Sequence, residues 1–152
     1  MPAIPALRSP YVKLGRLVHL GRMLDKIRLH AAGKLPEAYV KNLGDHRPNL
    51  FDARLCRFLG VEFEAVQDKV LAGHSDDEVV AWIEEVGDSR TDDECNVWNR
   101  FMMKIGWRDD RSAALQERVQ QYGLEGRGVE TFFDLIEYDE GRDPAATKPW
   151  LQ

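Results

Sequence analysis

The chain has few cysteines and no long apolar run. Its 152 residues include two cysteines, Cys56 and Cys95, which are too few for a disulfide framework or a zinc-binding cysteine cluster. No stretch approaches the roughly 18 apolar residues of a membrane span, and the first residues lack the charged and apolar regions of a secretory signal. Free thiols without such a signal favour a cytoplasmic protein that does not enter a membrane.

Several sequence motifs of catalysis are missing as well. The chain contains no Gly-x-Ser-x-Gly, no phosphate-binding P-loop, no His-Glu-x-x-His and no Cys-x-x-Cys. Its pI is near 5.4, whereas nucleic-acid-binding domains are commonly strongly basic. We therefore expect a non-catalytic binding or interaction protein without a cofactor, and nucleic acid is not the expected partner.

Signals for helix ends recur along the chain. Ser75–Glu78 and Thr91–Glu94 have the spacing of capping boxes, several glycines fall where helices of ordinary length should stop, and no hairpin signal is present. The sequence therefore predicts an all-α, single-domain bundle of six to seven short helices. We place these helices at 14–32, 52–59, 62–72, 76–86, 92–105, 112–122 and 129–140. The helical domain spans 11–140, between an N-terminal arm at 1–10 and a C-terminal tail at 141–152.

Charge is distributed unevenly between the two halves of the chain. Residues 1–60 hold 11 Lys or Arg and 4 Asp or Glu, whereas residues 61–152 hold 10 and 22. With about 100° per residue, the basic residues of the first helix fall opposite its apolar face, and the second helix adds two arginines. Guanidinium groups bind phosphate and carboxylate, so this basic face predicts a site for an anionic ligand or an acidic protein. Its residues are Arg16, His19, Arg22, Lys26, His30, Arg54 and Arg57.

The acidic residues leave other interpretations of the basic face open. Many of them fall in first helical turns, where they complement the helix dipole, but Glu130, Asp134 and Glu137 share one face of the last helix. These carboxylates either pair with the basic face or stay solvated. The alternative function is a small metalloprotein or enzyme with a His/carboxylate site between the first and last helices. Its candidate ligands are His19, His30, Asp134 and Glu137, with Asp25 as a further carboxylate.

Two further features indicate where interactions occur. Segment 35–50 is predicted to be a loop between the first two helices, and loops of this length are often functional. A homodimer is a third possibility, through an apolar face that includes Trp82 or Trp150.

Six short segments together resemble a known family. They are Pro10-Tyr11-x-Lys13-Leu14-Gly15, Arg22-Met23-x-Asp25-Lys26-x-Arg28, Cys56-Arg57-Phe58-Leu59-Gly60, Trp98-Asn99-x-Phe101-Met102, Gly106-Trp107-Arg108-Asp109 and Phe132-Phe133-Asp134-x-Ile136. In combination they resemble a bacterial family of small all-helical proteins catalogued as a domain of unknown function, over all but the first and last ten residues. The resemblance implies a complete single-domain bacterial protein. It implies no activity, cofactor or catalytic residue.

Overall fold

A computed structural model describes residues 3–151 and confirms the all-α, single-domain fold. In this range eight α-helices follow a small hairpin, and two 3-10 turns end the chain. The strands are β1 (Lys13–Leu14) and β2 (Leu17–Val18). The helices are α1 (Leu20–Ala31), α2 (Glu37–Val40), α3 (Phe51–Leu59), α4 (Phe63–Leu71), α5 (Asp76–Val86), α6 (Asp92–Lys104), α7 (Ser112–Gln121) and α8 (Phe132–Asp139), and the 3-10 turns are η1 (Pro144–Ala146) and η2 (Pro149–Leu151).

The start of the first helix is predicted wrongly. Residues 14–19 are not helical, because the chain forms an antiparallel hairpin in which Lys13 pairs with Val18 and Leu14 with Leu17. Gly15 occupies the turn with φ of 59°, a left-handed conformation that glycine adopts without a steric penalty. Arg16 and His19 therefore precede α1. The strands are too short for a period-two pattern to reveal them.

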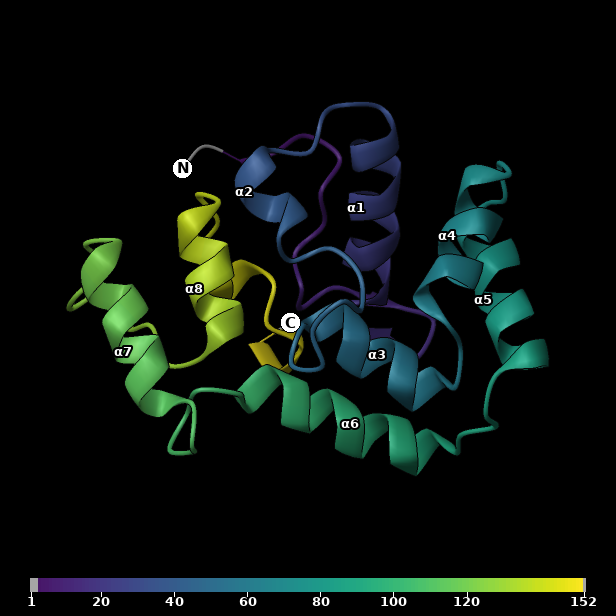
Figure 1. The fold of residues 1–152 in the computed structure, drawn as a ribbon. Helices are drawn as coiled ribbons and strands as arrows, with labels where there is room; N and C mark the ends of the chain where they lie inside the picture. The colour runs from purple at the N-terminus through teal and green to yellow at the C-terminus, as the bar shows by residue number, and fades with distance from the viewer. Residues whose placement is uncertain (1–2, 152) are drawn as a thin grey trace.

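Helix α1 lies at the centre of the fold, and its apolar residues contact several layers. Helices α4 and α5 cover one side of α1, α6 crosses below it, and the pair α7–α8 lies on the opposite side (Figure 1). Met23, Leu24 and Ile27 of α1 are almost completely buried against α3, α4 and α5. Burial of apolar area at about 25 cal/mol per Å² is the main stabilising contribution here. Because protein surrounds most of α1, its residues Arg22, Asp25 and Lys26 are buried as well, whereas His30 near its end is exposed.

A second apolar cluster joins the hairpin to α6 and α8. Tyr11 and Val18 pack with Met102 and Phe133, and all four side chains are at most 1% exposed. Asn99 of α6 accepts a hydrogen bond from the Val18 amide at 3.0 Å and donates one to the Arg16 carbonyl at 2.8 Å. This buried asparagine fixes the hairpin on α6 and so positions the residue that follows it, His19.

Helix ends follow the sequence signals closely. Both predicted capping boxes are present, with Ser75 and Thr91 accepting from the amides of Glu78 and Glu94 and each glutamate bonding back to its N-cap amide.

Segment 35–50 is not a plain loop, since it contains α2. No helix in residues 3–151 has the length and apolar character that crossing a membrane requires.

The predicted arm and tail pack against the body where the structure describes them. Leu7 is buried, and Arg8 forms an ion pair with Asp25 of α1 at 2.8 Å. In the tail, the Trp150 ring packs edge-on against Tyr11 with centroids 5.8 Å apart, while Trp150 stays 48% exposed. Trp82 is half-buried. A homodimer through either tryptophan stays a prediction.

Candidate functional site

A cleft of about 360 Å³ opens between the α1–α3 side of the molecule and the α7–α8 pair. Cavities that take small molecules commonly measure about 300–1,000 Å³. Its apolar and aromatic wall contains Leu50, Phe51, Tyr39, Tyr122, Phe132, Leu135 and Ile136. Its charged lining contains His19, Arg22, Lys26, Arg47, Arg111, Arg118, Asp139 and Glu140.

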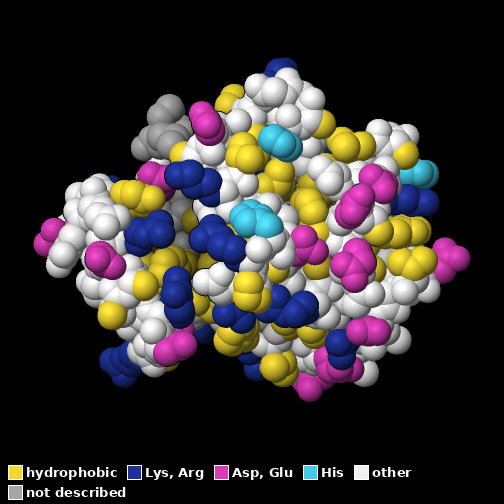
Figure 2. All heavy atoms as spheres, in the orientation of Figure 1, with side chains coloured by type: hydrophobic (Ala, Val, Ile, Leu, Met, Phe, Trp, Pro, Cys, Tyr) yellow, Lys and Arg dark blue, Asp and Glu magenta, His cyan; other side chains and the backbone are white. Residues whose placement is uncertain are grey.

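Three arginines of the lining are exposed and lack an ion pair within residues 3–151. They are Arg47 from the loop between α2 and α3, Arg111 at the N-cap of α7, and Arg118 within α7. The Arg111 guanidinium lies 5.4 Å from the centroid of the Phe132 ring, which also lines the cleft. Figure 2 shows Lys and Arg side chains gathered on this face, over the region of α2, α7 and α8. The cleft therefore presents uncompensated positive charge beside apolar surface.

The α1 side of the cleft is made of buried polar groups centred on Asp52. One oxygen of Asp52 lies 2.7 Å from His19 Nε2, and the other accepts from Lys26 Nζ at 2.8 Å and from the Gly44 amide at 2.8 Å. The side chains of His19, Lys26 and Asp52 are at most 5% exposed. A buried charge is tolerated when it is paired and hydrogen-bonded in this way.

The pKa values of this group follow from burial and from the neighbouring charges. Burial alone would raise the pKa of Asp52, but the charge of Lys26 and the hydrogen bonds lower it to about 2. Burial lowers the pKa of His19 to about 4, because protonation would place a positive charge away from water. Asp52 opposes this shift, and the positive charges of Lys26 and Arg22 add to it. At neutral pH Asp52 is ionised and His19 is neutral.

The backbone at His19 is in an uncommon conformation. Its φ of 67° and ψ of −25° are left-handed, although it is not a glycine. The His19 amide donates to the Pro10 carbonyl at 3.0 Å, and the His19 carbonyl accepts from Met23 at 2.9 Å. The side chain makes no capping hydrogen bond. Such conformations cluster at functional sites and are held by the surrounding structure, which here directs His19 towards Asp52.

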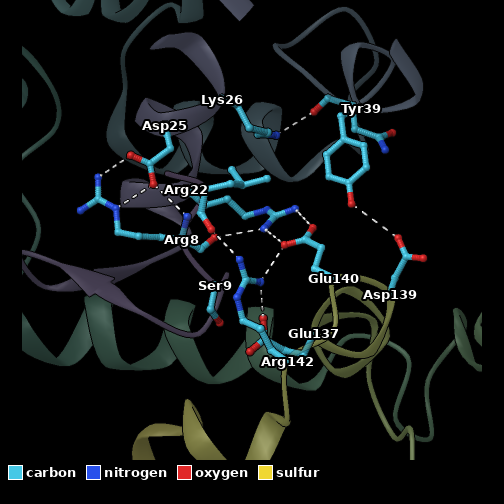
Figure 3. A network of polar contacts seen from close by, with 12 residues as sticks. Arg8, Ser9, Arg22, Asp25, Lys26, Tyr39, Glu137, Asp139, Glu140 and Arg142 are labelled. Atoms are coloured by element: carbon cyan, nitrogen blue, oxygen red, sulfur yellow. Dashed lines mark hydrogen bonds and ion pairs between the residues drawn. The ribbon is translucent and has the colours of Figure 1, made fainter. Parts of the chain in front are cut away.

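A second buried network joins α1 to the end of α8 (Figure 3). Arg22 contacts both oxygens of Glu140, at 2.9 and 2.5 Å, and also donates to the Arg8 carbonyl. Arg142 pairs with the same Glu140 and with Glu137. Burial would raise the pKa of Glu140, but hydrogen bonds and charge from Arg22 and Arg142 lower it. Arg22 and Lys26 are thus compensated, unlike the three exposed arginines.

The structure separates the seven residues predicted for the anion site. His19, Arg22 and Lys26 line the cleft, but all three are buried and already bonded to protein groups. Arg16 lies elsewhere and pairs with Asp92 at 3.0 Å. The remaining three lie outside the cleft: His30 and Arg57 are exposed, and Arg54 stacks over Phe101. The basic face is therefore divided between a buried part and an exposed part.

Most of the carboxylates proposed for pairing or metal binding have other partners. Asp134 accepts from Tyr11 at 2.6 Å, and Glu137 pairs with Arg142. Glu130 precedes α8, and its backbone amide, not its carboxylate, donates to Asp134. Asp25 pairs with Arg8. The structure does not bring His19, His30, Asp134 and Glu137 together, and residues 3–151 contain no group of three or more His, Cys, Asp or Glu placed to hold a metal.

Sequence reasoning missed Arg47, Arg111, Arg118, Asp52 and Glu140. Only Arg47 had a signal, because it falls in the long segment 35–50. Arg111 and Arg118 belong to the acidic half of the chain, where the charge count hides them. Asp52 and Glu140 resemble ordinary helix-end acids until the fold places them against α1.

Comparison with known proteins adds a family but no activity. A family model described as "Domain of unknown function (DUF5069)" matches residues 4–142. The match begins within the predicted N-terminal arm, so it includes most of that segment. No curated protein matches the chain.

Proposed function

The chain belongs to the DUF5069 family, and we propose that it binds a small anionic ligand in the cleft between α2, α3, α7 and α8. The observation that carries this proposal is the set of uncompensated arginines, Arg47, Arg111 and Arg118, lining one concave and partly aromatic site. A small ligand fits better than an acidic protein, because the charges line a cavity rather than a flat face.

The chemistry of the lining indicates the class of ligand. Guanidinium groups donate paired hydrogen bonds to carboxylate or phosphate, and Phe51, Tyr122 and Phe132 supply apolar contact area. Asp139 and Glu140 also line the cleft, at the C-terminal end of α8. We therefore expect an anion whose charged group faces α7 and whose carbon skeleton lies against the aromatic rings.

Titration calorimetry with two probes, succinate and phenyl phosphate, tests this function. Arg111→Gln and Arg118→Gln should each weaken binding about tenfold or more, since a hydrogen bond to a charged group contributes about 1.5–3 kcal/mol. Affinity should also fall between low and high salt. Arg57→Gln is the matched control, because Arg57 is exposed on α3 outside the cleft. Absence of binding by both probes, or equal weakening in the control, would contradict the proposal.

We further propose that the protein resides in a bacterial cytoplasm. Cys56 and Cys95 are unpaired and buried, as expected for a chain kept in a reducing compartment. The family resemblance supports the bacterial source. Measuring where a tagged full-length chain fractionates in a bacterial host tests the compartment.

A further inference from the structure

We propose that two copies of this chain form a symmetric dimer through the outer face of α6, which consists of Asp93, Val97, Phe101 and Lys104. The two α6 helices lie antiparallel, so that Asp93 of each copy pairs with Lys104 of the other. The dimer is independent of the anion site, because α6 contributes nothing to the cleft lining within residues 3–151.

Helix α6 has one buried face and one face turned away from the protein. The buried face contacts β2 and α8, and its residues are Cys95, Asn99, Met102 and Met103. With about 100° per residue, Asp93, Val97 and Lys104 fall on the opposite side within about 40° of one another, and Phe101 lies about 40° beyond Val97. Helix α6 runs along the lower edge of the fold, and no other element of residues 3–151 lies below it in this view (Figure 1).

The middle of the outer face is apolar although it is exposed. Val97 and Phe101 are 60% and 51% exposed, and because they lie four residues apart their side chains are neighbours. The Arg54 guanidinium lies 5.6 Å from the Phe101 ring centroid but leaves the ring half exposed. Trp150 extends the apolar surface, since its ring centroid lies 4.2 Å from the ammonium of Lys104. Exposed apolar surface bounded by charged residues is typical of an interaction site.

The two ends of the outer face carry opposite charges that have no ion pair within residues 3–151. Asp93 lies in the first turn of α6 and Lys104 in the last. The acids on either side of Asp93 are both paired, one with Arg16 and the other with Arg90. An acidic end, an apolar middle and a basic end therefore follow one another along about 20 Å of helix.

This order of charges is complementary to its own copy. The midpoint between Asp93 and Lys104 falls within about half a residue of the midpoint between Val97 and Phe101. A two-fold axis through this point places Asp93 against Lys104 twice and Val97 against Phe101 twice, as a symmetric dimer interface requires. No other register of two antiparallel α6 helices satisfies both pairs together.

A second copy is the partner that these charges favour. An acidic partner would be repelled by Asp93, and a basic partner would be repelled by Lys104. Antiparallel packing also places the N-terminal end of one helix dipole beside the C-terminal end of the other. Arg100, which flanks the outer face, lies near Asn96 of the second copy and so meets no second cation. Because each chain contributes a single helix, the interface is small and we expect a weak dimer.

Sedimentation velocity on the full chain, from about 1 to 200 µM, tests this dimer. The wild type should approach twice the 17.4 kDa mass of one chain as the concentration rises. Asp93→Lys and Lys104→Asp should each weaken the dimer about tenfold or more, because each reversal creates two pairs of like charges. Asp77→Lys is the matched control, since Asp77 is exposed and occupies in α5 the first-turn position that Asp93 occupies in α6. The mass of one chain at every concentration, or equal weakening in the control, overturns the inference.

Mixing the two single variants tests whether these charges meet across the two-fold axis. Asp93→Lys has lysine at both ends of the outer face, and Lys104→Asp has aspartate at both ends, so each variant repels itself and attracts the other. A one-to-one mixture should therefore form a heterodimer with an affinity within about threefold of that of the wild type. A mixture that associates no more tightly than the separate variants contradicts the pairing.

A measurement on the wild-type protein covers the case in which a variant does not fold. Carbodiimide joins a carboxylate directly to an amine that contacts it, so it should link Asp93 of one copy to Lys104 of the other. Equal amounts of ¹⁴N- and ¹⁵N-labelled chains show by mass spectrometry whether a link joins two copies. Absence of the mixed-label link from a sample that sediments as a dimer overturns the inference. A dimer that Trp82→Ala weakens and the α6 variants do not also overturns it, because that dimer uses another face.

Discussion

Arg22 and Glu140 form a bidentate ion pair that connects α1 to the C-terminal end of α8. Nη1 and Nη2 of Arg22 lie 2.9 and 2.5 Å from Oε1 and Oε2 of Glu140, and the two side chains are 5% and 1% exposed. Both residues also line the cleft. It therefore holds α8 at the position that defines one wall of the cleft.

Removing one member of this pair should strongly destabilise the protein. In Glu140→Gln, the buried Arg22 loses its carboxylate, and loss of one partner from a buried pair typically costs about 3–5 kcal/mol. The free energy of unfolding is measured by urea denaturation. Asp92→Asn is the control, because it breaks the exposed pair between Arg16 and Asp92 and should have little effect. Equal effects of the two substitutions would contradict the structural role of Glu140.

Acid should destabilise the protein through His19. Its folded pKa of about 4 lies below the unfolded value of about 6.5, so the unfolded chain binds the extra proton first and stability falls as the pH drops from 6.5 to 4. The change is on the order of 3 kcal/mol, at about 1.4 kcal/mol per pKa unit. Asp52, with a pKa of about 2, adds a further loss below pH 4.

Urea denaturation between pH 7 and pH 4 checks this dependence. His19→Gln removes the titrating group, so its stability should fall less steeply over this range than that of the wild type. His30→Gln, which changes an exposed histidine on the same helix, should keep the wild-type slope. Parallel slopes for His19→Gln and the wild type would show that His19 is not buried in its neutral form.

The capping box of α5 gives a prediction about local stability. Ser75→Ala removes the acceptor for the Glu78 amide, which lies 3.2 Å from Ser75 Oγ, and should cost about 1 kcal/mol. Ser75→Asp retains an acceptor at the N-cap and should stay close to the wild type. Thermal unfolding followed by circular dichroism measures both. An Asp variant as unstable as the Ala variant would argue against capping as the cause.

Two glycines should respond to alanine for different physical reasons. At Gly87, an added Cβ would lie 2.3 Å from the backbone carbonyl oxygen of Leu59, which accepts from the Asp88 amide at 2.8 Å. At Gly33, φ is 70° but nothing lies within 4 Å, so only the backbone conformation opposes alanine, at about 1–2 kcal/mol. Gly87→Ala should therefore lower the urea midpoint more than Gly33→Ala does, and the reverse order would contradict the close approach.

Most helix boundaries could be predicted because their signals are local. Ser75 and Glu78 form their capping box from residues three apart, and the two observed ends of α5 match the predicted range 76–86. The error at residues 14–19 also has a local cause. Leu17 continues the apolar spacing of α1, and it does belong to the same core, but it reaches that core from a strand. Periodicity reports which residues are buried and does not by itself exclude a short hairpin.

The candidate site shows the limit of this local information. The sequence alone determined that Arg22 and Lys26 share a side of α1 apart from its apolar positions, since residues four apart lie on one face of a helix. Only the tertiary structure decided that Asp52 and Glu140, 33 and 118 residues distant from His19 and Arg22, compensate this side. It also decided that Arg47, Arg111 and Arg118 face the same cleft. The physical reason is that helix spacing sets neighbours within a turn or two, whereas charge compensation and cavity lining depend on how separate helices pack.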